Sequence, residues 1–347
     1  LWHAHEMLFG FTAAVITGFM LTAVPGWTGA RRVAGLPLAV LLTAWVAGRL
    51  VIWFSAFLPA VLVAAIDMLN LPLLAGTVAI GLIKRPAPRN VIFLGLLLIL
   101  IIANGAVHAE WMQLTDDTAS WGLAVAMITT ILLIVILGGR VVPAFTRNAM
   151  IRRGDKNGYP RSSGLLDKAS IASTALVLAC YILVLPDWIT GTTAGLAAVT
   201  NFARWALWRW QSVLHDPIVW SLHLAYVWIP IGMAATAVAL LGNWLSHGTA
   251  LHILAIGAVG GMTLAMMTRA PLGHTGRQLV VIWPVAATYL MIAAAAILRS
   301  FGLELLPDYY FPVIFMAGGL WISAFVIFVV VYAPILTGPS LKQHIAD

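Results

Sequence analysis

Long apolar stretches interrupted by few charges constrain this chain more than any other feature of its sequence. Of its 347 residues, 62% are hydrophobic and only 9% are charged, which is far outside the composition of a chain that folds in water. The stretches have the length of a helix that crosses a bilayer, and they lack the short alternating pattern of β-barrel strands. The sequence therefore predicts an all-α, polytopic membrane protein.

Eleven stretches meet the length criterion when Pro, Gly and charged clusters are taken as their boundaries. They are residues 7–27, 36–57, 60–82, 91–109, 121–142, 168–186, 191–207, 218–242, 249–268, 280–298 and 311–333. The weakest is 191–207, which carries Asn201 and Arg204 and could instead be a re-entrant or interfacial helix. We expect one transmembrane domain over residues 1–347, with its largest loop at 143–167.

The loop charges predict how the chain is oriented in the membrane. With eleven spans, 17 of the 19 Lys and Arg residues fall on one side, Arg49 lies inside a span and only Arg299 lies on the other side. Cytoplasmic loops carry this excess, so the C-terminus and the basic loop 143–167 are predicted to be cytoplasmic. The net charge of +7 is thus a topology signal facing the lipid bilayer and predicts no nucleic-acid partner. Because the sequence opens at Leu1 without Met, we expect an upstream segment, which could hold a twelfth helix.

Five of the nine histidines are predicted to lie near the outer ends of spans, at one level of the membrane. They are His3, His5, His108, His247 and His252. Imidazole is the usual ligand of haem iron and copper, and helix bundles place such ligands on facing helices. The pattern predicts a metal or haem site in the outer half; the alternative is that each imidazole caps a helix end. His3 and His5 lie about 200° apart on a helix, so both can serve one centre only if the first span begins after them.

Two further histidines lie nearer the predicted cytoplasmic side. His223 is inside span 218–242, where an ionisable side chain is costly and indicates function; a hydrogen-bonded core histidine is the alternative. His274 lies between glycines in Leu-Gly-His-Thr-Gly-Arg, which allow close approach to a ligand or tight helix packing.

One pair of opposite charges is predicted within the membrane. Arg49 lies nine residues before Leu58 in the tight turn at Leu58-Pro59, and Asp67 lies nine residues after it. Antiparallel helices would place the two side by side, about 13 Å below the outer end. Such a pair could neutralise itself, hold a haem propionate or relay a proton.

An internal similarity links two distant segments. Residues 5–29 align without a gap on 252–276 with seven identities, among them His5/His252, Gly10/Gly257 and Gly29/Gly276. Parallel repeats of this kind occur in membrane transporters. Chance matching between two helices rich in Gly and Ala is the alternative.

Four motifs in order resemble the NnrS family of bacterial haem- and copper-containing membrane proteins. They are Trp2-His3-Ala4-His5-Glu6-Met7, Leu21–Pro25 with Trp27-Thr28-Gly29, Gly138–Asn148, and Leu272–Arg277. The resemblance implies a twelve-helix bacterial inner-membrane protein that carries haem b and copper and serves nitric oxide metabolism, denitrification and nitrosative-stress tolerance. The motif positions carried over are His3, His5, Arg140, His274 and Arg277, and His108, His223 and His252 match less compact family histidines.

The resemblance favours an oxidoreductase that binds nitric oxide and reduces it with electrons from quinol. In that scheme His252 or His5 is the axial haem ligand, and His3 and His108 bind copper. Glu6, Glu110 or the Arg49–Asp67 pair supply protons. His223 and His274 would serve a second haem or the quinol site, with propionates paired by Arg140, Arg269 or Arg277. The alternatives are a transporter of copper or a metal–nitrosyl species, and a haem-based sensor or scavenger of nitric oxide without turnover.

Overall fold

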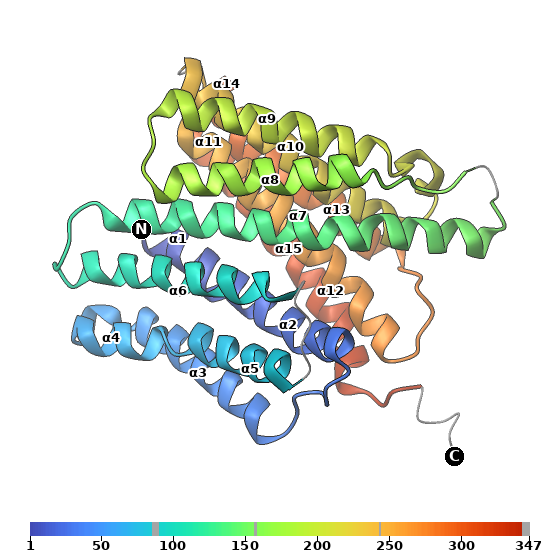
Figure 1. Ribbon diagram of the computed structural model, residues 1–347, viewed down its shortest axis with the longest axis horizontal. Helices are drawn as coiled ribbons and strands as arrows, with labels where there is room; N and C mark the ends of the chain where they lie inside the picture. Colours follow the sequence, from blue (N-terminus) through green and yellow to red (C-terminus); the bar gives the residue numbers. More distant parts are fainter. Residues whose placement is uncertain (85–89, 156–157, 243, 342–347) are drawn as a thin grey trace. The chain divides into compact units, whose positions relative to one another are not determined.

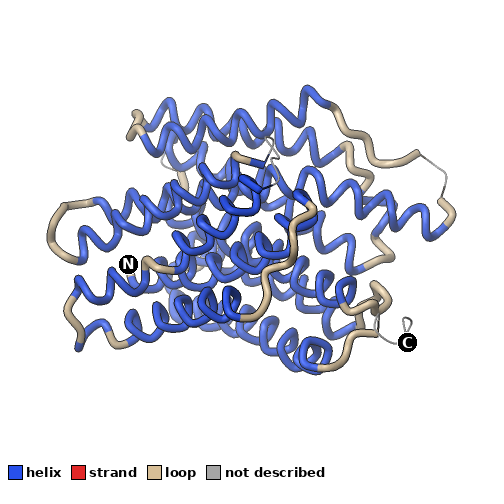
Figure 2. The backbone as a smooth tube through the Cα atoms, turned by 60° about the horizontal axis from the view of Figure 1, so that its bottom comes forward, coloured by secondary structure: helices blue, strands red, loops and turns tan. Residues whose placement is uncertain are grey.

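A computed structural model describes residues 1–84, 90–155, 158–242 and 244–341. These residues form helices joined by loops and turns, with no strand among them (Figure 2). Ten helices in the described chain are long and apolar enough to cross a membrane. The predicted all-α, polytopic fold is therefore confirmed. Arg85, Arg89, Lys156 and Lys342, four of the cations assigned to the inner side, lie outside the described residues.

Internal contacts divide the chain into two compact units, which we call unit 1 (Leu1–Leu133) and unit 2 (Ile134–Asp347). The helix α7 (Thr118–Arg153) carries the boundary between them. Each unit is described by itself below.

Unit 1 begins with one continuous helical segment and continues with an antiparallel set (Figure 1). Its elements are α1 (Trp2–His5), the π-helix η1 (Glu6–Thr12), α2 (Ala13–Thr28), α3 (Leu36–Trp53), η2 (Ser55–Phe57), α4 (Ala60–Asp67), α5 (Asn70–Lys84) and α6 (Ile92–Trp111). The tight turn predicted at Leu58-Pro59 is present, and it returns α4 alongside α3. The predicted span 60–82 is two helices, because the chain tightens after Asp67, where Leu69 N donates to the Ile66 carbonyl at 3.2 Å.

Unit 2 contains the remaining helices. After α7 they are α8 (Gly164–Ile182), α9 (Asp187–Ala206), η4 (Trp210–Val213), α10 (Pro217–Gly242), α11 (His247–His252), the π-helix η5 (Ile253–Gly260), α12 (Gly261–His274), α13 (Trp283–Ile297), the π-helix η6 (Leu298–Gly302), α14 (Leu303–Leu305), η7 (Pro307–Tyr309) and α15 (Tyr310–Thr337). In Figure 1, α8, α9 and α10 lie side by side.

The helix α9 corresponds to the weakest predicted span. It is 20 residues long, enough for about 30 Å, but it is not among the helices apolar enough to qualify as spans. Its Asn201 and Arg204 are buried, and it packs against α8 and α10. The eleventh span, and with it the cytoplasmic C-terminus, stays a prediction.

The predicted loop 143–167 is wrong over its first part, because α7 continues to Arg153. The apolar run ends near residue 142, but the polar residues that follow are compatible with a helix, and Pro143 is accommodated inside it. The helix ends before Gly154, whose φ of 75° is left-handed and is readily adopted by glycine. Several of the predicted loop cations therefore lie on a helix that extends beyond its apolar part.

The internal similarity has a structural counterpart. His5 directly precedes the π-helix η1, and His252 directly precedes the π-helix η5. Gly29 and Gly276, which match in the alignment, both adopt left-handed conformations, with φ of 64° and 76°. Because π-helices are rare and occur often at functional sites, this agreement favours a true repeat over chance matching.

Candidate metal centre

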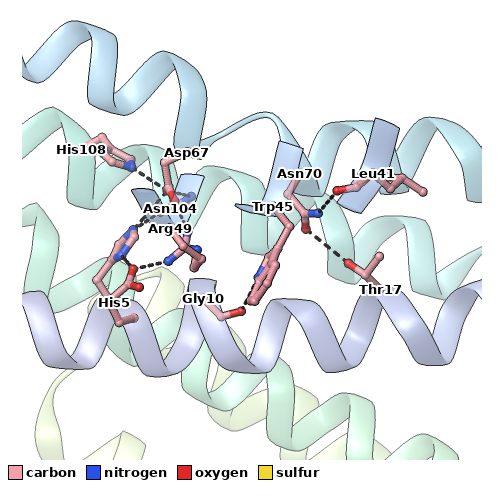
Figure 3. A network of polar contacts seen from close by, with 11 residues as sticks. His5, Gly10, Thr17, Leu41, Trp45, Arg49, Asp67, Asn70, Asn104 and His108 are labelled. Atoms are coloured by element: carbon pink, nitrogen blue, oxygen red, sulfur yellow. Dashed lines mark hydrogen bonds and ion pairs between the residues drawn. The ribbon is translucent and has the colours of Figure 1, made fainter. Parts of the chain in front are cut away.

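A buried polar cluster lies in unit 1, where the first helix passes α3, α4 and α6 (Figure 3). The first helix contributes His5 and Glu6 at the junction of α1 and η1. Side chains also bind two backbone carbonyls of the π-helix η1. Trp45 Nε1 donates to the Gly10 carbonyl at 2.9 Å, and the Thr12 hydroxyl donates to the Met7 carbonyl at 2.8 Å. These bonds stabilise the π-turn that positions His5.

Asp67, the last residue of α4, is the centre of the cluster. Its side chain is 1% exposed, and its Oδ2 atom accepts hydrogen bonds from His108 Nε2 at 2.9 Å and Asn104 Nδ2 at 3.0 Å. His5 Nε2 lies 3.3 Å from the same oxygen and 3.0 Å from Asn104 Oδ1. Two imidazoles and an amide thus converge on one buried carboxylate oxygen.

Arg49 links this carboxylate to a second one. Its guanidinium donates to Asp67 Oδ1 through one terminal nitrogen and to Glu6 Oε1 through the other. Glu6 Oε1 also lies 3.2 Å from His5 Nδ1, and the Glu6 side chain is 21% exposed. With both imidazoles neutral, two carboxylates against one guanidinium leave a net negative charge, which favours a bound cation.

Three groups of the cluster fit a metal ion. Ligand atoms of His5, Asp67 and His108 all lie within 4.8 Å of one another, and all three residues are buried. The ligand atoms of an ion bound at about 2.1 Å lie about 3 to 4 Å apart. Small movements of these three side chains would therefore bring all of their ligand atoms within reach of one ion. Two imidazoles and one carboxylate, with open positions, are typical of non-haem iron(II), and nitrogen and oxygen donors also suit Cu(II).

Aromatic rings enclose the two imidazoles. The Trp111 ring centroid lies 4.9 Å from that of His5 and 5.3 Å from that of His108. Phe9 lies 5.2 Å from His5 on another side. These rings exclude water and orient the imidazoles, so interactions within the cluster gain strength from the low local dielectric.

Gly48 is the reason that α3 and α4 approach so closely at this site. A Cβ atom at Gly48 would lie 3.2 Å from Asp67 Oδ1 and 3.3 Å from Asp67 Cα. Gly48 directly precedes Arg49. One turn of α3 therefore provides both the close approach of α3 to α4 and the ion pair between Arg49 and Asp67. The cluster is therefore built into the packing of the helices.

Comparison with known proteins agrees with the motifs. A family model described as "NnrS protein" matches residues 1–340. The chain belongs to the NnrS family. It is also 24% identical over 225 residues to "Inner membrane protein YjgN" of Salmonella typhimurium (strain LT2), which covers 57% of this chain and 54% of that protein. The chain thus spans about half the length of this relative. No solved structure matches this chain. Its many apolar helices and this similarity make it a multi-pass membrane protein.

The structure brings together five of the predicted site residues. They are Glu6, His5, Arg49, Asp67 and His108. Asn104, Trp111 and Gly48 belong to the same site but were not predicted, because the contacts of α3 and α6 with Asp67 join helices that the sequence does not pair. His108 and Asn104 are four residues apart, the spacing of one helix face, and this was the available signal.

The NnrS motif histidine His3 does not join His5 at the centre. Helix α1 begins at Trp2, so both residues are helical, and His3 is exposed while His5 is buried. This corrects the expectation that the helix begins after both, on which their shared site depended. Glu110, predicted as a proton donor, accepts a hydrogen bond from Ala119 N at 2.7 Å and so caps the start of α7.

The other predicted residues lie in unit 2. Arg140 and His274 are exposed, and Arg277 donates to the Pro339 carbonyl at 3.4 Å. His252 Nδ1 donates to the Gly248 carbonyl at 2.6 Å. His223 and Arg269 are buried. His223 Nε2 lies 2.7 Å from the Thr146 hydroxyl, while its Nδ1 has no hydrogen-bond partner among the described residues.

Proposed function

We propose that His5, His108 and Asp67 bind a copper ion, and that the protein binds nitric oxide and reduces it with electrons from quinol. The observation that carries the proposal is the convergence of both imidazole Nε2 atoms on Asp67 Oδ2, in a buried cluster with a net negative charge. Copper is the ion that the NnrS resemblance implies, and imidazole with carboxylate suits it. Bound there, it would supply one-electron chemistry.

The proposed reaction balances with quinol as the donor. Two molecules of nitric oxide, two electrons and two protons give nitrous oxide and water. Oxidation of one quinol to quinone releases both electrons and both protons. No other co-reactant is needed.

The protein's own residues would position the ion and move protons. Asp67 holds both imidazoles in place, and Asn104 and Arg49 fix the orientation of its carboxylate. Glu6 is more exposed than the other carboxylate and contacts His5 Nδ1, so it is placed to pass protons inward. Trp111 and Phe9 exclude bulk water from the imidazoles.

Haem b, which the resemblance also implies, fits unit 1 poorly. Both imidazoles there point Nε2 at one carboxylate oxygen and pack against Trp111. His223 fits better, because its buried Nδ1 has no partner in the described chain. The Thr146 hydroxyl also donates to the Val142 carbonyl at 2.9 Å, so Nε2 carries the proton of a neutral ring and Nδ1 keeps its lone pair. We assign haem to His223.

The test is an anaerobic dithionite-reduced-minus-oxidised spectrum of the purified protein, before and after nitric oxide, with copper and iron counted per chain. The proposal expects copper to be lost in His108→Ala and retained in His274→Ala, a matched control because His274 is exposed. A b-type band that shifts with nitric oxide, and turnover with a quinol analogue, support reduction. Retention of copper in His108→Ala, or a spectrum that nitric oxide leaves unchanged, would overturn the proposal, and haem binding without turnover would indicate a sensor.

A copper transporter is the second candidate, and one observation favours it. The helical segment that carries Asp67 is broken directly after it, between α4 and α5. The π-helix η1 directly follows His5. Interrupted helices within internal repeats are typical of transporters. Uptake of copper into proteoliposomes without electron transfer would support this candidate over the reductase.

A further inference from the structure

Arg269 is a buried cation that the candidate metal centre does not use. It lies in α12, five residues before the helix ends at His274, or about 7.5 Å from that end. The residue is 6% exposed, and its Cζ atom lies 3.8 Å from the ring centroid of Phe145 on α7. Its NH1 atom is buried and has no hydrogen-bond partner within the described parts of the chain.

The surroundings of Arg269 do not balance its charge. No carboxylate of the described residues lies within ion-pair distance of it. Arg152 and Asp216 are close enough to interact with its charge, but they pair with each other at 3.6 Å, so one positive charge remains. The Phe145 ring attracts a cation but accepts few N–H hydrogen bonds, and a buried charge without a partner is costly.

A second unpartnered atom lies on α10, in a histidine that contacts the next residue of α7. Thr146 follows Phe145 and contacts His223 of α10, whose Nδ1 atom is buried and lacks a partner in the described structure. His223 of α10 and Arg269 of α12 thus contact consecutive residues of α7, and each side chain holds a buried polar atom without a partner in the described chain. Buried polar groups are normally satisfied. The Arg269 atom is a donor, so it indicates an acceptor ligand, whereas the lone pair of His223 Nδ1 suits the haem iron proposed above.

We infer that the Arg269 guanidinium, with Arg152 beside it, binds an oxyanion where α7, α10 and α12 meet. The planar guanidinium fits a phosphate or a carboxylate with paired hydrogen bonds. The oxyanion is the phosphate of an anionic lipid headgroup or the propionate of a haem. The lipid source is independent of the proposed function, whereas the propionate source rests on it.

Lipid-dependent stability of the full chain tests the lipid source. The purified, delipidated protein is melted in detergent with increasing phosphatidylglycerol, and with phosphatidylcholine as the uncharged comparison. A ligand that binds only the folded state raises the melting temperature in proportion to its affinity. We expect Arg269→Gln to weaken the response to phosphatidylglycerol by about tenfold to a hundredfold in concentration.

Arg147→Gln is the matched control. Arg147 also lies over an aromatic ring, with Cζ 5.4 Å from the centroid of Tyr159, but it is exposed. It should respond to phosphatidylglycerol as the unmodified protein does. If Arg269→Gln does not fold, Arg269→Met removes the charge while filling the same apolar surroundings.

Haem retention on the same preparations tests the propionate source. If the oxyanion is a propionate, the Arg269 variant loses haem per chain while its response to phosphatidylglycerol matches that of Arg147→Gln. If it is a lipid phosphate, the Arg269 variant keeps its haem and responds more weakly to phosphatidylglycerol than Arg147→Gln does. The inference is overturned if the Arg269 variant equals the control in both measurements. Copper per chain is counted separately, so failure of the proposed metal centre would not affect this result.

Discussion

The guanidinium of Arg204 lies against Gly139, in the space that a Cβ atom at that position would occupy. Arg204 is 3% exposed and donates from Nε to Asp167 at 2.7 Å and from NH1 to the Val135 carbonyl at 2.9 Å. Tyr226, which contacts the same guanidinium, donates to Asn201 Oδ1 at 2.7 Å. The glycine pair that begins the third NnrS motif thus makes room for a buried polar network among α7, α8, α9 and α10.

We therefore predict that Gly139→Ala destabilises the protein by about 1 to 3 kcal/mol, the usual cost of overpacking a core. The added methyl group would displace Arg204 from its partners, which strains an otherwise satisfied network. Gly18→Ala is the control, because a Cβ atom there meets nothing within 4 Å. Thermal unfolding in detergent measures both variants. Equal melting temperatures for the two would contradict the close packing at Gly139.

Removal of Arg49 should be the most damaging single change in the charge cluster of unit 1. Arg49→Gln leaves Asp67 and Glu6 as two carboxylates without their shared cation, and breaking a buried ion pair from one side typically costs about 3 to 5 kcal/mol. Glu6→Gln in the same background should restore part of the loss, since it removes one of the uncompensated charges. Arg140→Gln, at an exposed position, should have little effect. The free energies of unfolding of the two single variants and the double variant give the interaction energy between Arg49 and Glu6. Strictly additive losses would show that the two residues act independently.

Gly48→Ala is predicted to weaken metal binding without removing any ligand. The methyl group would push against the Asp67 carboxylate and backbone, which shifts the acceptor shared by His5 and His108. Changes that disturb the orientation of ligands usually lower metal affinity by about 10- to 100-fold. Gly76→Ala, where a Cβ atom meets nothing within 4 Å, is the control in the same unit. Titration with copper under a competing chelator measures both affinities, and identical values would argue against a role for Gly48.

The sequence predicted the class of fold and the pairing of Arg49 with Asp67 for simple geometric reasons. Apolar runs of the length of a bilayer allow few structures other than helices. A tight turn at Leu58-Pro59 places residues equally distant from it at the same depth. These features depend on one helix or on two neighbouring helices, and they are readable without knowledge of the wider packing.

The rest of the site depends on contacts between helices that are distant in sequence. Depth placed His5 and His108 at one level, but it also placed His3 and His252 there, and depth alone does not distinguish which helix faces meet. Helix α7 was predicted to end with its apolar run, because hydropathy reports the lipid-facing part and not the end of the hydrogen-bonded helix. The π-turn after His5 was also not predicted, since its residues have the apolar, glycine-containing pattern of an ordinary membrane helix.

The last prediction concerns the two histidines on different faces of the first helix. His3 and His5 are adjacent in the motif, yet His5 points into the cluster and His3 is exposed. His5→Ala should therefore lose bound copper, because it removes one of three ligands, whereas His3→Ala should keep the copper stoichiometry of the unmodified protein. Copper per chain, counted on monodisperse preparations of both variants, decides the matter. Loss of copper in His3→Ala to the same extent as in His5→Ala would mean that both imidazoles serve one ion and that the helix begins after them when metal is bound.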